Sequence, residues 1–459
     1  MSVFSLSNLK KTWYYLQKNG IRNAVWAVLE RIGQEQEVYT WQEPDEKTLS
    51  FQREHSASLR ISIVVPAYRT KKEHLEAMLN SVSKQSYPHW ELIVADAGGT
   101  AESVQAWAKK NGICLREAAD ASNLAEWKDQ SIMLCTLSEN KGISANTNAG
   151  IELAAGDAVG LLDHDDLLTA NALWEMADCL EKEKKRGKQK LVLFSDEDKC
   201  DGAASRFYEP NFKPDFDGEL LLTNNYICHF TVIETAFLKE LKLRSGFDGA
   251  QDYDLMLRAY AAGGQFVHVP KVLYHWRCHE ASTASNPQSK RYAYEAGQRA
   301  LEDYCLRKGW KATVSGLKHL GFYREDYEDS VFCQRPEIGI WAKPLPGGRD
   351  IFGIRHPKGF LVSGLYENDG LMRYAGLRKG YSGPMHRAAL QQSAPAADLR
   401  SMEVCSALKE RYAQTIAELK EACQGLPTAA QEKKILQKSM EFCKEATAAG
   451  YGILWDPQA

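Results

Sequence analysis

The stretch Gly160-Leu161-Leu162-Asp163-His164-Asp165-Asp166 places three carboxylates directly after a short apolar run that begins at Ala158. Such a run, bounded by polar residues, predicts a buried β-strand. Open α/β sheets bind their ligands at the carboxyl ends of the strands, which is where these acids would lie. Neighbouring carboxylates on an extended segment suit Mg²⁺ or Mn²⁺. The alternative is that Asp165 or Asp166 caps a helix that starts near Leu167.

Strand and helix patterns alternate on both sides of this stretch. Short β-branched or apolar runs predict strands at residues 61–65, 90–95 and 191–194. Helical spacing of apolar residues follows at residues 75–85, 101–111, 145–155 and 171–185. This alternation predicts an α/β fold with βαβ units on a parallel sheet, whose strand ends meet at one edge. The turns after the first two strands lack the glycine pattern of a dinucleotide fingerprint or a P-loop.

The composition is that of a globular protein with several domains. The 459 residues suffice for two or three domains, and 57 Lys and Arg against 60 Asp and Glu give a net charge of −3. That balance argues against a general binder of polyanions, so no nucleic-acid partner is expected. We find no apolar run of about 18 residues, no signal-peptide pattern and no C-x-x-C pair among the 11 cysteines. These features predict a cytoplasmic protein with reduced thiols.

Three segments differ in character and predict the domain organisation. Residues 1–58 combine a helical segment at 7–34 with a polar, acidic linker at 35–58. Basic and aromatic residues share the helical segment, which either contacts an anionic membrane surface peripherally or packs on its own domain. Residues 59–330 hold the alternating strands and helices, and residues 331–459 are predicted to form a smaller C-terminal α/β domain.

Several further polar residues stand at strand ends or helix starts. Lys141 precedes a predicted helix, and either meets a diphosphate or is a solvated turn residue. Asp196 belongs to a second acidic strand end at 195–199, which serves acceptor-side chemistry or caps a helix. Asp252 falls in the first turn of a predicted helix, as a helix cap or as a general base toward a hydroxyl. His279 closes the domain, as a structural hydrogen-bonding residue or as a ligand of the acidic site.

Eight segments occur in the order that a known family shows. They are residues 64–68, 91–96, 140–144, 161–166, 195–199, 251–254, 276–279 and 282–287. By these motifs, the chain from Arg60 to Glu325 resembles the inverting glycosyltransferases of family 2, which have the Rossmann-like GT-A fold. The variety it resembles builds bacterial O-antigen, capsule or other surface polysaccharide, and includes many rhamnosyl- and galactosyl-type enzymes.

The resemblance implies which residues bind the substrate. Pro66, Tyr68 and Asp96 would border the nucleotide base, with the Asp96 carboxylate accepting the imino N–H of uracil or thymine. The remaining substrate-binding residues would be Lys141, Asp163, Asp196 and Trp276.

The resemblance also implies a metal site and a catalytic base. Asp163 and Asp165 would form a D-x-D pair that binds Mn²⁺ or Mg²⁺, with His279 as a further ligand and Asp252 as the base. The chain departs from the family at Ala97, where a second Asp is common, and at Gln251, where Glu is common. Neither departure removes one of the acids to which the resemblance assigns a role.

These roles predict a metal-dependent transferase that moves a sugar from a UDP- or dTDP-sugar to a hydroxyl of a growing, lipid-linked or polymeric glycan. One displacement, with Asp252 accepting the hydroxyl proton, would invert the anomeric configuration. A nucleotidyltransferase would instead need a Gly-rich, basic loop after the first strand, where Ala67-Tyr68-Arg69-Thr70 stands. The other alternative is a catalytically inactive glycan- or nucleotide-binding pseudoenzyme, which would have lost acids that this sequence retains.

The C-terminal residues carry a partial internal repeat. Residues 438–459 align without a gap on residues 251–272, and Ser439 takes the place of Asp252. Five identities, from Ala446 to Pro457, support the alignment, and residues 336–340 and 380–387 resemble the back half of another glycosyltransferase module. Residues 331–459 are therefore predicted to be a degenerate, non-catalytic module that braces the active domain, contacts acceptor or forms a homodimer.

Overall fold

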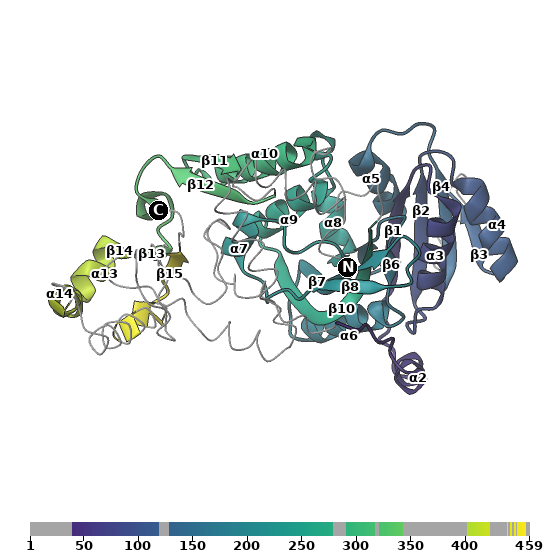
Figure 1. The fold of residues 1–459 in the computed structure, drawn as a ribbon, viewed down its shortest axis with the longest axis horizontal. Helices are drawn as coiled ribbons and strands as arrows, with labels where there is room; N and C mark the ends of the chain where they lie inside the picture. The colour runs from purple at the N-terminus through teal and green to yellow at the C-terminus, as the bar shows by residue number, and fades with distance from the viewer. Residues whose placement is uncertain are drawn as a thin grey trace, which may run out of the picture. The chain divides into compact units, whose positions relative to one another are not determined.

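The computed structural model describes residues 39–118, 128–278, 291–316, 321–342, 402–422, 438, 441–442, 445–446 and 448–455. The chain divides into two compact units (Figure 1). The main unit comprises Thr40–Val314 and Glu325–Gln334, and the tail unit includes Ser315–Arg324 and the chain from Arg335 onward. The helices predicted at 7–34 lie outside the described residues, and the domain boundaries proposed at 58 and 330 stay predictions.

The sheet of the main unit has a parallel half and a mixed half. In the parallel half, β1 (Ile61–Ala67) lies between β2 (Trp90–Asp96) and β5 (Ala158–Leu161), and β2 continues to β4 (Ser131–Thr136) and β3 (Cys114–Glu117). In the mixed half, β9 (Thr231–Glu234) runs antiparallel to β5 and to β7 (Leu191–Asp201). The sheet then continues through β10 (Gln265–Cys278) to β6 (Leu167–Leu168), while β8 (Phe207–Asn211) also pairs with β7.

Helices cover both faces of this sheet (Figure 1). On one face, α3 (Lys72–Ser83), α4 (Ala101–Asn111) and α6 (Ala172–Lys185) share one hydrophobic core with β1, β2, β4 and β7. On the other, α5 (Ile143–Leu153) packs on β1 and β2, and α8 (Thr235–Leu241) packs on β5 and β9. Every residue of β2 is buried, as expected for a parallel strand covered on both faces. The predicted α/β fold is therefore confirmed.

Several helices of the main unit pack around α9 (Gln251–Ala261), whose first turn carries the predicted base Asp252. It packs against α10 (Arg291–Lys308), α8, α7 (Gly218–Thr223) and the short helix η2 (Ser245–Phe247). The elements that follow α10 in the chain are β11 (Ala312–Gly316), β12 (Tyr323–Tyr327) and α11 (Val331–Gln334).

The stretch predicted as a linker contains a helix, α2 (Glu46–Glu54). Its residues Leu49 and Gln52 are buried, and the Gln52 side chain accepts a hydrogen bond of 2.7 Å from the Ser86 hydroxyl. An apolar stripe is missing from this helix because the buried amide of Gln52 and the single apolar residue Leu49 hold it to the sheet domain. Residues 46–54 are therefore helical and packed on the sheet domain, while the role of residues 35–58 as a linker stays a prediction.

Two helix-capping interpretations are also wrong. Leu167 and Leu168 form strand β6, and α6 begins only at Ala172, so neither Asp165 nor Asp166 caps a helix. The acidic residues 195–199 lie inside β7 rather than at its end, and most of them are buried. They can remain in a buried strand because basic side chains from neighbouring segments pair with their carboxylates.

The tail unit contains a small sheet and short helices. In it, β13 (Ile338–Ala342) pairs antiparallel with β14 (Met402–Val404) and parallel with β15 (Gly452–Trp455). The helices α13 (Ser406–Arg411) and α14 (Ala413–Ala422) follow β14.

One local pattern recurs at the aligned positions of the predicted repeat. In the main unit, Gly264 N donates to Ala259 O at 2.8 Å, after a glycine with φ of +77°. In the tail unit, Tyr451 N donates to Ala446 O at 3.1 Å, after a glycine with φ of +90°. Each turn leads into a strand that pairs in parallel with an earlier strand of its own unit. The identity of the tail as a second module stays a prediction.

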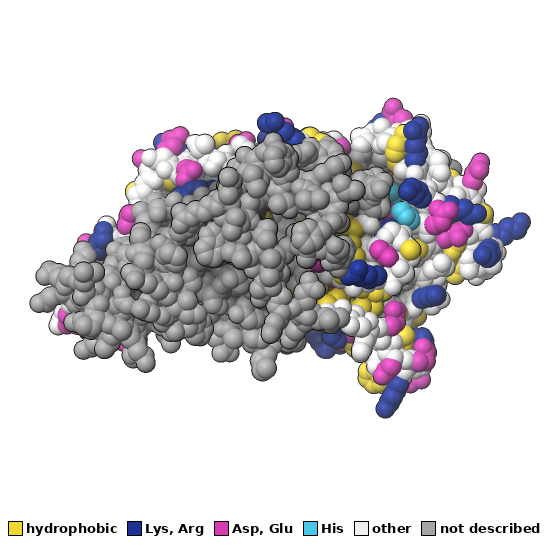
Figure 2. All heavy atoms as spheres, viewed as in Figure 1, with side chains coloured by type: hydrophobic (Ala, Val, Ile, Leu, Met, Phe, Trp, Pro, Cys, Tyr) yellow, Lys and Arg dark blue, Asp and Glu magenta, His cyan; other side chains and the backbone are white. Residues whose placement is uncertain are grey.

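The visible surface of the main unit carries charges of both signs. Figure 2 shows Lys and Arg side chains interspersed with Asp and Glu over the part of the unit that holds α3 and α4. Among the described helices, none has the length and apolar character needed to span a membrane.

Gly156, between α5 and β5, tests how tightly the chain is packed at the amino ends of β1 and β5. A Cβ there would lie 2.7 Å from Arg60 O and 2.8 Å from Ser62 N, both backbone atoms that cannot move aside easily. We expect Gly156→Ala to lower the free energy of unfolding by about 1–3 kcal/mol, measured by urea denaturation. Gly202→Ala is the control, because nothing lies within 4 Å of its Cβ position. Equal stability of the two variants would contradict this packing.

Candidate active site

A cavity that is partly open to solvent lies at the carboxyl ends of β1 and β5. Pro66 of β1 and Asp163, just after β5, line one side, and Asp252 in the first turn of α9 lines another. The loop before β9 adds Asn225 and His229. Because β9 runs antiparallel to β5, the start of β9 lies at the same edge of the sheet as the end of β5. The cavity therefore occupies the place where open α/β sheets bind ligands.

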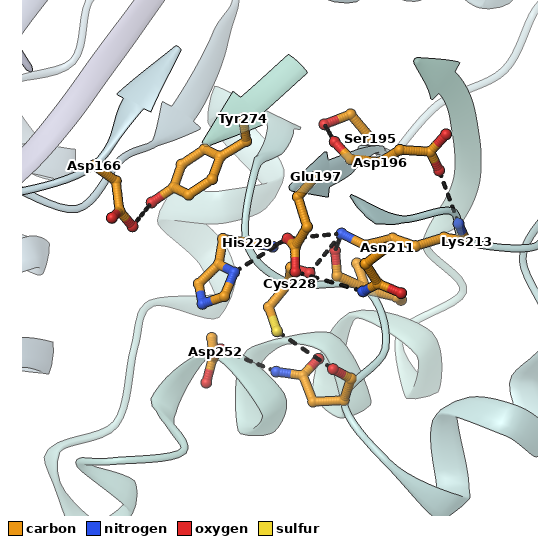
Figure 3. Close-up of polar contacts among 12 residues, drawn as sticks. Asp166, Ser195, Asp196, Glu197, Asn211, Lys213, Cys228, His229, Asp252 and Tyr274 are labelled. Atoms are coloured by element: carbon orange, nitrogen blue, oxygen red, sulfur yellow. Dashed lines mark hydrogen bonds and ion pairs between the residues drawn. The ribbon is translucent and has the colours of Figure 1, made fainter. Parts of the chain in front are cut away.

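The three acids of the central motif have different surroundings. Asp166 is buried, accepts a hydrogen bond of 2.7 Å from Arg277 N and another from the Tyr274 hydroxyl (Figure 3). Burial, together with Asp163 and Asp165, raises the pKa of Asp166 well above its usual range. Asp163 faces the cavity instead, and its carboxylate accepts no hydrogen bond from any described residue. Asp166 thus ties the acidic segment after β5 to β10, while the carboxylate of Asp163 is left available to a ligand in the cavity.

Asp252 is held with both carboxylate oxygens oriented. Its Oδ1 accepts a hydrogen bond of 2.9 Å from Tyr253 N, and its Oδ2 accepts one of 2.9 Å from Asn225 Nδ2. Burial raises the pKa of Asp252, although the hydrogen bonds and the nearby His229 lower it in part. A carboxylate with a raised pKa is a stronger base toward a hydroxyl than an exposed aspartate.

A buried ion pair supports the third titratable group of the cavity, His229. Glu197 of β7 accepts hydrogen bonds from His229 N at 2.5 Å and Nδ1 at 3.1 Å, and lies 3.2 Å from Lys213 Nζ. Burial alone would raise the pKa of Glu197, but Lys213 and His229 lower it to about 2. Burial alone would lower the pKa of His229, but Glu197, Asp166 and Asp163 raise it to about 9. At neutral pH the cavity therefore contains an imidazolium beside its carboxylates.

The residues predicted to border a nucleotide base stand at adjacent strand ends. Asp96 pairs with Ala67 across β1 and β2, and its carboxylate accepts backbone N–H groups of Gly98, Thr100 and Ala101 at 2.8–3.2 Å. Tyr68 follows Ala67 directly and is 40% exposed. The structure brings Tyr68 and Asp96 near each other beside Pro66, although only Pro66 lines the cavity.

Other predicted substrate-binding residues have partners of their own. Lys141 lies 3.2 Å from the carboxylate of Glu139, and both side chains are exposed. Asp196 is buried and accepts hydrogen bonds from Lys213 N and His268 Nε2, both at 2.8 Å. Trp276 is half-buried with its ring 4.6 Å from that of His229. None of the three lines the described cavity, and the predicted metal ligand His279 lies outside the described residues.

The N-terminus of α5, the helix that follows Lys141, is occupied by the carboxylate of Asp248. Ser144 N and its hydroxyl donate to Asp248 Oδ1 at 3.3 and 2.5 Å, across 104 residues of sequence. Gly142, with φ of +95°, leaves room for this carboxylate, since a Cβ there would lie 2.3 Å from Asp248 Oδ2. Asp248 precedes α9 by only a few residues, so this contact joins the start of α5 to the segment that carries Asp252.

Asn225 and His229 are the cavity residues that the sequence did not single out. Both belong to the polar stretch Thr223-Asn224-Asn225-Tyr226 and the residues that lead into β9. The only signal was a polar run before an apolar strand. This polar run reaches the cavity only because β9 is antiparallel to β5, and the local sequence does not reveal that direction.

The chemistry of the cavity fits a hard divalent cation in part. Asp163 offers a carboxylate without a hydrogen-bond partner among the described residues, and Asp165 adds repulsion that helps to raise the pKa of Asp163. A cation shared by the carboxylates of Asp163 and Asp165 would relieve that repulsion. In the described part of the chain, no cluster of three or more His, Cys, Asp or Glu residues converges as a complete metal site. Two carboxylates fit an ion that takes its other ligands from water and substrate phosphate.

Comparison with known proteins identifies the domain. Residues 62–241 match the model of Glycosyl transferase family 2. The chain is 36% identical over 255 residues to the uncharacterized protein y4gI of Sinorhizobium fredii, and 34% over 256 residues to the O-antigen biosynthesis protein RfbC of Myxococcus xanthus. These matches cover 55% and 56% of this chain, but only 26% and 19% of the relatives. The amylovoran biosynthesis glycosyltransferase AmsB of Erwinia amylovora is 28% identical over 47% of this chain and 70% of its own length.

The sheet has helices on both faces and acids at the carboxyl ends of its strands, an arrangement of the α/β class that agrees with the family match. The chain carries a glycosyltransferase domain of family 2, as its motifs predict. It spans less than a third of the length of y4gI and of RfbC.

The buried pair of Lys213 and Glu197 can be tested by its effect on stability. Lys213→Met leaves the Glu197 carboxylate without its main partner, so we expect a loss of about 3–5 kcal/mol in the free energy of unfolding. Adding Glu197→Gln should recover part of that loss. The exposed pair of Lys182 and Asp178, separated by 2.6 Å, is the control, and Lys182→Met should cost at most about 1 kcal/mol. Similar losses at both lysines would show that the Lys213 pair is not a buried ion pair.

Proposed function

We propose that the protein is a metal-dependent inverting glycosyltransferase that moves a sugar from a UDP- or dTDP-sugar to a hydroxyl of a growing cell-surface glycan. One observation carries this proposal: Asp163, within the residues that match family 2, and Asp252, just beyond them, line the same cavity. The names of RfbC and AmsB, in O-antigen and amylovoran biosynthesis, support a polysaccharide as the product.

The donor nucleotide would lie along the ends of β1 and β2. Pro66, Tyr68 and Asp96 would border the base, and the backbone hydrogen bonds to Asp96 fix the position of its carboxylate. Each carboxylate oxygen has more than one lone pair, so Asp96 can still accept an imino N–H from uracil or thymine. Lys141, Asp196 and Trp276 stay predictions as substrate-binding residues.

Asp252 would act as the general base. Each of its oxygens accepts one hydrogen bond, which leaves a lone pair for the proton of an acceptor hydroxyl. The hydroxyl oxygen forms its bond to the anomeric carbon as the bond to the diphosphate breaks, and the hydroxyl proton passes to Asp252. This single displacement inverts the anomeric configuration and leaves no covalent enzyme intermediate.

Asp163 and Asp165 would hold Mn²⁺ or Mg²⁺, with His279 as the further predicted ligand. When bound, the cation supplies positive charge that stabilises the diphosphate as it leaves. Asp166 takes no direct part, since Arg277 and Tyr274 engage its carboxylate.

The acceptor and location follow from the same proposal. A growing glycan, lipid-linked or polymeric, would present its hydroxyl on the α9 side of the cavity, where Asp252 lies. Nucleotide sugars are made in the cytoplasm, so we place the reaction there, at the inner face of the plasma membrane if the acceptor is lipid-linked. The pseudoenzyme alternative is less well supported, because Asp96, Asp163, Asp165 and Asp252 are all present in the chain, and Asp163 and Asp252 line the cavity.

Replacing the base tests this mechanism directly. We expect Asp252→Asn to lower kcat by about 10²- to 10⁴-fold, because the amide cannot accept the hydroxyl proton. Affinity for UDP or dTDP should change little, and NMR of the product formed by the parent should show an inverted anomeric centre. Asp178→Asn, in an exposed pair on α6, is the control and should keep full turnover. Normal turnover by Asp252→Asn would exclude Asp252 as the base.

The raised pKa of Asp252 predicts a pH profile. The base works as the carboxylate, so kcat/KM should rise with pH through a pKa higher than that of an ordinary aspartate. The Asn225 hydrogen bond lowers that pKa, so Asn225→Ala should move this acid limb to higher pH at saturating Mn²⁺. Asn111→Ala, at the exposed end of α4, should leave the limb in place. An unchanged limb in Asn225→Ala would separate Asn225 from the base.

A further inference from the structure

The cavity has more negative than positive charge among its side chains. Within the described part of the chain, its lining includes the carboxylates of Asp163 and Asp252, and the imidazole of His229 is its only basic group. No Lys or Arg is among these lining residues. A diphosphate brings further negative charge, which two nearby carboxylates repel. A donor site of this kind needs cationic groups, and among the described residues that line this cavity His229 is the one that supplies such a group.

The His229 ring is fixed in place with one nitrogen open. Glu197 engages Nδ1 at 3.1 Å, and the ring stacks on Tyr274 at 5.5 Å with 7° between the planes. Nε2 has no hydrogen-bond partner among the described residues, and Figure 3 shows this second nitrogen turned away from Glu197. The side chain is 20% exposed, and it lines the cavity. Its open donor position therefore faces the space that a ligand would fill.

Lys213 holds the loop before β9 in the conformation that positions the His229 ring. Its ammonium is 1% exposed and donates to Ile227 O at 3.0 Å, to Cys228 O and to Glu197. It thus binds the two residues that precede His229 as well as the carboxylate that orients the ring. The same arrangement keeps the imidazole protonated at neutral pH, because Glu197 and the nearby aspartates raise the pKa of His229 to about 9 against the effect of burial. A protonated ring carries an N–H at Nε2.

A histidine that only holds the fold together has a different pattern in the same unit. His268 is completely buried at its side chain, with Nε2 2.8 Å from Asp196 and Nδ1 3.2 Å from Asp215. Both of its nitrogens are engaged within the protein. His229 differs from His268 because only its Nδ1 is engaged within the protein, which leaves Nε2 for a ligand.

We propose that His229 binds the diphosphate of the sugar donor, donating a hydrogen bond from Nε2 to a phosphate oxygen, and that Glu197 and Lys213 position it. This inference rests on the proposed function, because it assigns a ligand contact within that donor site. Charge-assisted hydrogen bonds between imidazolium and phosphate are among the stronger polar contacts in proteins. His229 would thus add to the positive charge of the cation held at Asp163 and Asp165.

The test compares a ligand that carries the diphosphate with one that lacks it. UDP affinity is measured by calorimetry and uridine affinity by ligand-observed NMR, both at fixed Mn²⁺; dTDP and thymidine replace them if the parent binds thymidine nucleotides. His229→Asn keeps an amide near Nδ1 for Glu197 but cannot reach the position of Nε2. We expect it to weaken UDP binding about 10- to 100-fold and to leave uridine binding unchanged.

Two further variants make the result specific. His229→Gln, whose amide can place a neutral donor near Nε2, should lose less UDP affinity than His229→Asn, and it serves in place of His229→Asn if that variant does not fold. His89→Asn, at an exposed histidine 3.0 Å from Asp129, should match the parent. Unchanged UDP affinity, or an equal loss for UDP and uridine, would overturn the role of His229. A parent that binds neither UDP nor dTDP would instead overturn the proposed function, and this inference with it.

Discussion

The parallel pairing of β1 with β2 and β5 is the constraint on which the rest of the site depends. It places the carboxyl ends of three strands at one edge, where Pro66, Asp96 and Asp163 follow or end them. The antiparallel strand β9 then brings the loop with His229 to the same edge, and α9 adds Asp252. Segments far apart in sequence thus meet in one cavity without any long irregular connection, because the sheet fixes their ends.

Gathering acids at a buried edge has an electrostatic cost, and the structure shows how it is offset. Burial raises the pKa values of Asp163 and Asp252, since an ionised carboxylate loses its hydration there. Charged side chains behind the cavity wall offset part of this cost. There Lys213 neutralises Glu197, and both residues hold His229 in place as a cation that lines the cavity. The remaining excess of negative charge is what a divalent cation would balance. Electrostatics therefore links the buried core of β7 to the ligand-binding face.

The local sequence pattern predicted most strands and helices of the sheet domain, and it singled out the two acids that line the cavity. The range predicted for α4 matches the structure, and Asp163 and Asp252 line one cavity as their motifs implied. What the sequence missed depends on long-range pairing. Residues 195–199 continue a buried strand because basic side chains from distant segments pair with their carboxylates, and α2 is held through the amide of Gln52. His229 gains its place only from the direction of β9, which hydrophobic periodicity does not encode.

The acidic cavity is proposed as the metal-dependent donor site of a glycosyltransferase. Calorimetric titration of the purified protein with UDP and with dTDP, each with and without Mn²⁺, is the decisive experiment. We expect one nucleotide to bind, with an affinity that rises strongly when Mn²⁺ is present, because the diphosphate and the carboxylates of Asp163 and Asp165 then share a cation. Binding of neither nucleotide by folded protein, or binding that Mn²⁺ leaves unchanged, would contradict it.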